Sequence, residues 1–148
     1  MEVLGKAGLE DLSQLVDLVS ALLDQESEFQ SDQDKQRRGL SMIIENSSAG
    51  AIYTARSDGS IQAMVSLLYS ISTAEGGPVC WLEDMFVRED CRKRGLGSRL
   101  LQFALDDARS SGFLRVSLLT DASNAPAQAI YRRNGFRPSS MIVLRRNF

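Results

Sequence analysis

Three side chains in this sequence could carry acid–base chemistry. Glu83 and Asp84 stand side by side in an otherwise apolar run, and Tyr131 lies in a later helical segment. The chain has no histidine, which excludes Ser-His-Asp and Cys-His catalysis and every His-ligated metal site. Its two cysteines cannot complete a zinc tetrahedron. Proton transfer must therefore come from carboxylates, tyrosine, lysine or cysteine, and we expect no metal.

A second group of residues suits the binding of a phosphate. It consists of Arg92, Lys93, Arg94, Gly95, Leu96, Gly97 and Ser98. The two glycines allow a tight turn in which several backbone N–H groups point at one spot before the next helix. The helix N-terminus adds about half a positive charge there, and the three basic side chains lie beside it. We therefore expect a phosphate-bearing ligand at this loop.

Other interpretations of the loop fit less well. A Walker loop requires Lys and Ser or Thr after its second glycine, and this pair does not follow Gly97. A dinucleotide fingerprint would place Leu100 where the third glycine belongs, with Asp121 as the ribose ligand. Too few residues follow Asp121 for the second half of that fold. A basic loop that merely caps a helix is the remaining alternative.

The loop and two flanking blocks together resemble the GNAT family of N-acetyltransferases. The loop looks like the family's pyrophosphate loop. Trp81–Val87 resembles the strand along which the pantetheine lies, and it is closest in motif to the diamine and thialysine acetyltransferase branch. Asn124–Pro126 and Ile130–Phe136 resemble the family's second cofactor motif. The resemblance covers residues 79–138.

The resemblance implies transfer of an acetyl group from acetyl-coenzyme A to a primary amine of a small cationic acceptor or a protein N-terminus. Glu83 matches the family's general-base position and Tyr131 its general-acid position. The cofactor contacts implied outside the loop are Met85, Phe86, Val87, Asn124 and Ala127. The acceptor contacts implied are Glu26, Glu28 and Asp84. A catalytically silent coenzyme A sensor would need neither Glu83 nor Tyr131, and an NAD-type oxidoreductase would use Asp121.

Charge is distributed unevenly along the chain. Residues 1–34 contain nine acidic residues and one basic residue, whereas the whole chain has a net charge of −2. The remainder is therefore basic. Such segregation suits a site with an anionic cofactor on one side and a cationic acceptor on the other. Two ordinary solvated faces would give the same counts.

Composition bounds the rest. With 148 residues and 43% hydrophobic content, we expect one domain, residues 1–148. No 18-residue apolar stretch or signal peptide is visible, so we expect a cytoplasmic enzyme with free thiols at Cys80 and Cys91. The expected partner is a small-molecule amine, without nucleic acid or membrane, and a homodimer is compatible with the sequence.

Periodicity predicts the elements that would position these residues. The predicted helices are Leu9 to Gln25, Asp32 to Asn46, Leu96 to Gly112 and Pro126 to Gly135. The predicted strands are Val3–Gly5, Ile52–Ala55, Ile61–Tyr69, Val79–Val87, Arg115–Thr120 and Met141–Arg145. Asp58-Gly59 predicts a tight hairpin turn.

These elements predict an α/β fold with a mixed, mostly antiparallel six- or seven-stranded sheet and helices on both faces. By resemblance this is the acyl-CoA N-acyltransferase (GNAT) fold, in which strands 79–87 and 115–120 splay apart to admit the cofactor. Glu83 and Asp84 would point to opposite faces of their strand unless a bulge intervenes.

Overall fold

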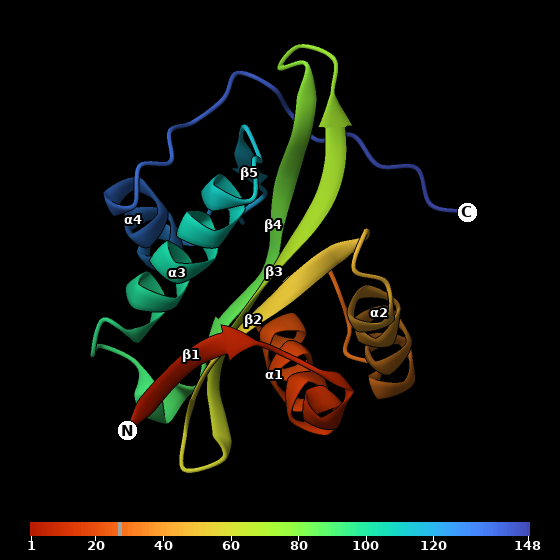
Figure 1. Ribbon diagram of the computed structural model, residues 1–148. Coiled ribbons are helices and arrows are strands. Elements are labelled where there is room, and N and C mark those ends of the chain that lie inside the picture. Colours follow the sequence, from red (N-terminus) through yellow and green to blue (C-terminus); the bar gives the residue numbers. More distant parts are fainter. Residues whose placement is uncertain (27) are drawn as a thin grey trace.

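The computed structural model describes residues 1–26 and 28–148. Within this part, a five-stranded mixed sheet is flanked by α1 and α2 on one face and by α3 and α4 on the other (Figure 1). The strands are β1 (Glu2–Lys6), β2 (Gly50–Ser57), β3 (Ser60–Ser72), β4 (Gly77–Val87) and β5 (Val116–Leu118). The helices are α1 (Leu12–Gln25), α2 (Gln33–Glu45), α3 (Leu96–Ser110) and α4 (Ala125–Arg133), with short 3-10 turns η1 (Leu9–Asp11) and η2 (Glu89–Cys91).

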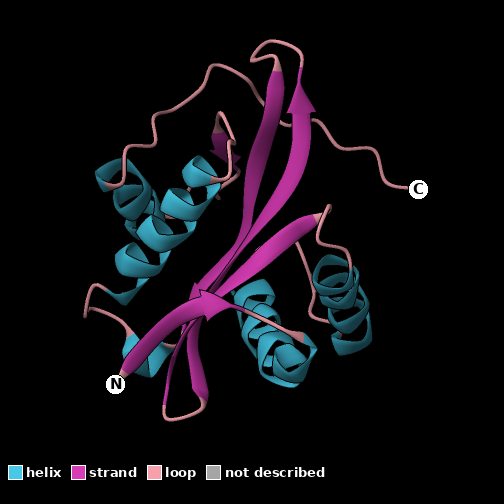
Figure 2. Cartoon of the chain, in the orientation of Figure 1, coloured by secondary structure: helices cyan, strands magenta, loops and turns pink. Residues whose placement is uncertain are grey.

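Strand order follows chain order, β1-β2-β3-β4-β5. The first four strands pair antiparallel, and β5 pairs parallel to β4 after the crossover through α3 (Figure 2). The β2–β3 turn has positive φ angles at Asp58 (50°) and Gly59 (77°), as a tight two-residue hairpin turn requires. The hairpin prediction is therefore confirmed, and so is the α2 cap, since Asp32 accepts from the N–H groups of Asp34 and Lys35.

The sheet has fewer strands than predicted. Five are present among the described residues, not six or seven, and the predicted strand Met141–Arg145 is wrong. Residues 141–144 form no ladder, and their side chains are 50–87% exposed, so no neighbouring strand satisfies their backbone or covers their apolar surface. β5 spans Val116–Leu118, shorter than the predicted Arg115–Thr120, because β4 pairs with it only from Cys80 to Leu82.

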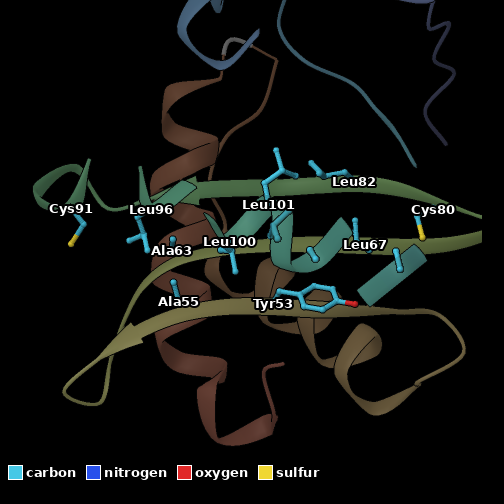
Figure 3. Packing of buried hydrophobic residues seen from close by; sticks show 13 residues of the cluster. Tyr53, Ala55, Ala63, Leu67, Cys80, Leu82, Cys91, Leu96, Leu100 and Leu101 are labelled. Carbon is cyan, nitrogen blue, oxygen red and sulfur yellow. The ribbon is translucent and has the colours of Figure 1, made fainter. Parts of the chain in front are cut away.

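Two apolar clusters hold the layers together. One lies between the sheet and α3, where Leu67 and Leu82 pack with Leu100 and Leu101 (Figure 3). The other lies between the sheet and α1, and Phe86 belongs to it. Leu82 and Phe86 of β4 therefore contribute to opposite faces of the sheet. Among the helices that the structure describes, none combines the length and hydropathy needed to cross a bilayer.

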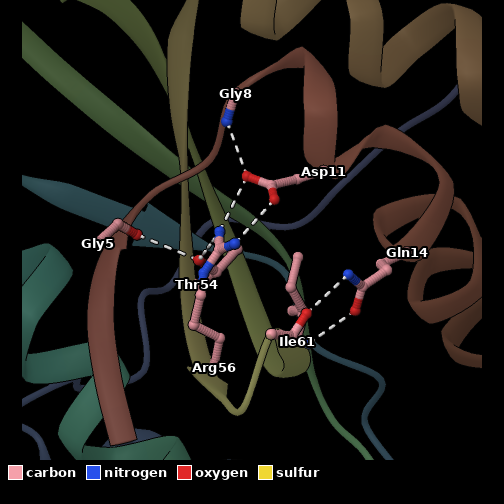
Figure 4. Close-up of polar contacts among 8 residues, drawn as sticks. Gly5, Gly8, Asp11, Gln14, Thr54, Arg56 and Ile61 are labelled. Atoms are coloured by element: carbon pink, nitrogen blue, oxygen red, sulfur yellow. Dashed lines mark hydrogen bonds and ion pairs between the residues drawn. The ribbon is translucent and has the colours of Figure 1, made fainter.

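Polar contacts fasten the start of α1 to the β2–β3 hairpin. Asp11, 4% exposed, receives two hydrogen bonds of 2.9 Å from the guanidinium of Arg56 and one of 3.0 Å from Gly8 N–H (Figure 4). The hydrogen bond from Arg56 is the main reason that the pKa of Asp11 is lowered. Gln14 accepts from Ile61 N–H at 2.7 Å. These contacts fix the direction of α1 and so the place of its far end.

Candidate active site

The loop before α3 has the geometry of an anion-binding turn. Lys93 and Gly95 both adopt left-handed backbone conformations, with φ of 65° and 75°. Gly95 is the N-cap of α3 and has no side chain that could accept from the first turn. The N–H groups of Leu96, Gly97 and Ser98 lack intrahelical partners by their position in the helix. They remain available to an anionic ligand.

Gly97 fills a tight space between α3 and β4. A Cβ atom at this position would lie 3.3 Å from Met85 Cε and 3.3 Å from Val87 Cγ2. Gly97 thus allows the first turn of α3 to approach the strand closely, which brings the N–H groups of the turn to the end of β4.

The arginines of the loop are held in place by backbone carbonyls. Arg92 Nε donates to Val87 O at 2.9 Å, and its guanidinium lies over the Phe86 ring at 5.2 Å. Arg94 donates to Asp90 O at 3.1 Å. Each guanidinium keeps further N–H groups, so both side chains can still face a phosphate.

A β-bulge lies in β4 at the acidic pair. Met64 pairs with Phe86, whereas Ser66 pairs with Glu83, so Asp84 and its successor together oppose a single residue of β3. Asp84 has a φ of 52°, a left-handed conformation that aspartate tolerates better than most residues. Pairing with β5 ends at Leu82, just before the bulge, so among the described residues the β4 backbone from Glu83 onward has no β5 partner. The two strands are therefore unpaired in the region where the sequence predicted that they splay apart.

The bulge gives the two carboxylates different environments. Glu83 is exposed and Asp84 is half-buried. Burial raises the pKa of Asp84 to about 6, and the negative charges of Glu83 and Glu26 add to the increase. The more buried carboxyl group is therefore Asp84, not Glu83.

Glu26 brings the acidic end of α1 to the same place. It caps the helix, its N–H donating to Leu23 O at 3.1 Å. Burial raises the pKa of Glu26, and the charges of Asp121, Glu28 and Glu83 raise it further. The structure thus brings Glu26, Glu83 and Asp84 together, as the acceptor-site hypothesis requires.

Glu28 lies on the outer side of this group and is exposed. Its carboxylate meets Arg145 at 3.6 Å, and the Arg145 guanidinium lies 5.6 Å from the Phe29 ring centroid. The charge of Arg145 lowers the pKa of Glu26. Arg145 of the C-terminal segment therefore places a positive charge next to Glu28 and near Glu26. The sequence analysis did not predict this contact.

Tyr131 approaches the carboxylates from α4. Its ring meets Phe136 edge-on, 5.8 Å between centroids, and packs against the cluster under α3. Burial raises the pKa of Tyr131 to about 12, and the charge of Glu26 contributes. The phenol therefore stays protonated over any ordinary assay pH.

The second predicted cofactor segment forms the start of α4. Asn124 caps the helix, its Oδ1 accepting from Ala127 N–H at 3.2 Å. This bond occupies the Ala127 N–H, so it is the Asn124 amide nitrogen that remains to meet a ligand. At the other end of α4, Asn134 donates to Ser98 Oγ at 3.3 Å, a contact that the sequence analysis did not foresee.

An open groove of about 500 Å³ runs beside the loop on the α1 face. It is lined by residues of α1 and by the end of β4, including Phe86 and Arg92, but not by the acidic pair or Tyr131. We therefore locate the candidate active site at the side chains around the bulge. The groove lies next to this site.

Comparison with known proteins points to one family. The model of the acetyltransferase (GNAT) family matches residues 15–136. An uncharacterized N-acetyltransferase, YhfO of Bacillus subtilis (strain 168), is 28% identical over 128 residues, which are 84% of this chain and 85% of that protein. A mycothiol acetyltransferase of Clavibacter michiganensis is 46% identical over 57 residues, 38% of this chain but only 19% of that protein.

Solved structures show the same fold. A possible acetyltransferase from Clostridium difficile 630 superposes with a TM-score of 0.89 at 15% identity, over 100% of this chain and 98% of that chain. A protein from Clostridium acetobutylicum described as a predicted acetyltransferase, solved with acetyl-CoA, gives a TM-score of 0.82 at 16% identity, over 99% and 96% of the two chains. At these identities the likeness establishes the fold alone.

Proposed function

Because the chain belongs to the acetyltransferase (GNAT) family, we propose that it transfers the acetyl group of acetyl-coenzyme A to a primary amine. The observation that carries this proposal is the first turn of α3, whose N–H groups are uncapped and lie against the unpaired end of β4. The residues present fit the cofactor: a basic loop for the pyrophosphate and free strand backbone for the pantetheine. Loop residues Arg92 to Ser98 would hold the pyrophosphate. Residues Met85 to Val87, together with Asn124 and Ala127, would hold the pantetheine arm.

The reaction forms a C–N bond and breaks a C–S bond. The amine nitrogen attacks the acetyl carbonyl carbon, and the sulfur leaves as a thiolate. We assign Glu83 to accept the proton that the amine loses, directly or through water, since it is the exposed carboxylate at the bulge. We assign Tyr131 to assist the leaving sulfur, because its hydroxyl stays protonated.

The acceptor in this proposal is a cation. Glu26 and Asp84 lie close enough for the Glu26 charge to raise the pKa of Asp84, and one ammonium group would relieve that repulsion. The motif likeness to the diamine and thialysine branch also favours an acceptor with a second positive charge. Glu28 would bind that second charge, since it already meets the Arg145 guanidinium.

A screen of amines tests the proposal. Thiol release from acetyl-coenzyme A would be measured with spermidine, lysine, kanamycin and a peptide with a free N-terminus, which represent four acceptor classes. We expect amine-dependent release with at least one, and the fastest serves as the acceptor in the experiments below. Binding of acetyl-coenzyme A without release by any amine would favour the silent sensor, and binding of NAD instead would favour the dinucleotide alternative.

We further propose a homodimer in the cytoplasm. The support is the apolar run Met141–Leu144, whose side chains are 50–87% exposed, together with a sheet whose last strand, β5, lies at its edge. A second copy would cover this surface. Light scattering on the full chain, compared with Ile142→Ser/Leu144→Ser, measures the state, and a wild type that is monomeric at micromolar concentration would refute the dimer.

A further inference from the structure

Ser66 carries a buried hydroxyl group without a hydrogen-bond partner. It lies in the middle of β3 and is 0% exposed, and its Oγ forms no hydrogen bond within the part of the chain that the structure describes. Leaving a buried hydroxyl unpaired costs free energy, and most buried polar side chains avoid it. An alanine here would fold at least as well, so the hydroxyl requires a reason other than stability.

The position of Ser66 in the sheet supplies that reason. Its register partner in β4 is Glu83, and directly opposed residues of an antiparallel pair project from the same face with Cβ atoms about 4.5–5.5 Å apart. Nearby on this face, Met64 and Phe86 are apolar and buried. Ser66 is thus a polar position in an apolar layer, at the residue where the bulge begins.

We propose that Ser66 is a positioning residue for Glu83, to whose carboxylate its hydroxyl donates a hydrogen bond. The inference rests on the proposed function, in which Glu83 takes the proton of the attacking amine. The Ser66 O–H bond stays intact throughout, and the proton that Glu83 gains comes from the amine. In the structure Glu83 is exposed and not bonded to Ser66, so the bond would form through a change of the Glu83 rotamer and would then hold that rotamer.

The charges around Glu83 show why such a donor would matter. Asp84 follows it in β4, and Glu26 faces it from the end of α1. Both are acidic, and like charges oppose the ionised form of a carboxylate. Arg145, the basic side chain described above on this side, lies against Glu28. A hydroxyl donor would offset this repulsion at the Glu83 carboxylate and hold it where it can accept the proton of the amine.

Ser20 provides a matched control. It lies in α1, is 9% exposed, and its Oγ also forms no hydrogen bond with the described residues. Ser20→Ala and Ser66→Ala therefore remove the same kind of group from the same side of the sheet. Only Ser66 opposes Glu83. Ser66→Thr keeps the hydroxyl at a position that suits a β-branched residue.

The experiment measures kcat/KM from pH 6 to pH 9 and the melting temperature for each variant. Ser66→Ala is expected to melt no lower than wild type, yet to lose about tenfold in kcat/KM at pH 6 and less than about twofold at pH 9. The loss is larger at low pH, because free amine is scarce there and removal of its proton by a well-placed carboxylate matters most. Ser66→Thr should keep the wild-type profile, and so should Ser20→Ala.

A second comparison isolates the path through Glu83. In a Glu83→Gln background, Ser66→Ala should change kcat/KM by less than about twofold at every pH, because the group that it positions is gone. An equal loss in both backgrounds, or a Ser66→Ala profile that matches wild type, would overturn the inference while acetyl transfer stands. A wild type that acetylates no amine would overturn the proposed function, and this role with it.

Discussion

The side-chain amide of Asn134 joins the end of α4 to the first turn of α3. Its Nδ2 donates to Ser98 Oγ at 3.3 Å and to Ile130 O at 2.8 Å. A backbone carbonyl can only accept, so the amide nitrogen must face it and the orientation is determined. No residue of α4 is fully buried, and among the described residues this is the one hydrogen bond between the two helices. Tyr131 lies three residues before Asn134 and is therefore its neighbour on the same side of the helix.

Asn134→Leu should therefore disturb both halves of the site. We expect acetyl-coenzyme A affinity to fall about threefold to tenfold, as for one lost hydrogen bond, and kcat to fall because Tyr131 is no longer held. Calorimetry measures the first and steady-state kinetics the second. In a Tyr131→Phe background the kcat effect should vanish while the affinity effect persists. Loss of kcat by the same factor in both backgrounds would show that α4 is merely destabilised.

Gly97→Ala should weaken the site by separating α3 from β4. The added Cβ meets Val87 Cγ2 at 3.3 Å, and a β-branched side chain in a strand cannot move aside easily. Gly39→Ala is the control, since Gly39 lies in α2 with nothing within 4 Å of its Cβ position. Helical Gly→Ala exchange alone stabilises by about 0.5–1 kcal/mol.

Gly39→Ala should thus raise the melting temperature. Gly97→Ala should show no such rise in melting temperature, and it should bind acetyl-coenzyme A more weakly, as measured by calorimetry. Equal gains in stability at both positions, with unchanged affinity, would mean that the close approach of α3 to β4 is not needed.

Local features of the chain were predicted well because their causes lie within a few residues. Asp58-Gly59 forms a tight turn by itself, and Asp32 caps α2. Gly95 precedes α3 in a left-handed conformation, which is favoured by glycine and by the start of the helix next to it. The loop, β4 and α4 could be placed on these grounds and by their resemblance to the GNAT family.

Non-local features could not be predicted in the same way. The bulge at Asp84 depends on the register of β3, and the Asn134–Ser98 bond joins residues 36 positions apart. Residues 141–145 have strand-forming side chains but no adjacent strand in the chain as described, so pattern alone gave a wrong element there. The geometry of the candidate active site therefore depends on contacts between residues that are far apart in the sequence.

The raised pKa of Asp84 leads us to expect that the free energy of unfolding depends on pH. The pKa moves from 3.8 to about 6, so the folded protein resists ionising this group. Folding therefore has no such cost well below pH 3.8, where the group is protonated in both states; the cost grows between pH 3.8 and about 6 and is constant above that. Asp84→Asn, which also tolerates the left-handed φ, should stabilise the protein at pH 8 by at most about 3 kcal/mol and at pH 4 by less than about 0.6 kcal/mol.

Asp58→Asn is the control for that experiment. Asp58 has a similar φ of 50° but is exposed at the β2–β3 turn, so its exchange should change the free energy of unfolding by less than about 0.5 kcal/mol at either pH. Urea unfolding at pH 4 and pH 8 measures both. A gain for Asp84→Asn that does not depend on pH would refute the assignment of its cause to ionisation.

Neutralising the end of α1 should weaken acceptor binding. Glu26→Gln/Glu28→Gln is expected to raise KM for the amine about tenfold at pH 8, where wild-type carboxylates are ionised, and to leave acetyl-coenzyme A affinity unchanged. The difference from wild type should shrink toward pH 5, as Glu26 and Asp84, both with raised pKa values, take up protons. Asp24→Asn, at an exposed position two residues before Glu26, is the control. An unchanged KM would make the acidic segment a solvated face only.

Tyr131→Phe tests the group that assists the leaving sulfur. A thiol with a pKa near 8.5 lies about 3.5 units below a phenol at about 12, so complete proton transfer to the thiolate would be uphill by about 5 kcal/mol. Tyr131 therefore acts chiefly by donating a hydrogen bond as charge develops on sulfur, a contribution of roughly 10²-fold in kcat.

The Tyr131→Phe variant should lose that factor but keep its melting temperature, because the ring and its contact with Phe136 remain. Tyr69→Phe, whose ring packs on Phe113, should retain wild-type kcat. Since the pKa of Tyr131 is about 12, wild-type kcat should show no descending limb from this group up to pH 10, and turnover of Tyr131→Phe within a few-fold of wild type would mean that the thiolate leaves without it.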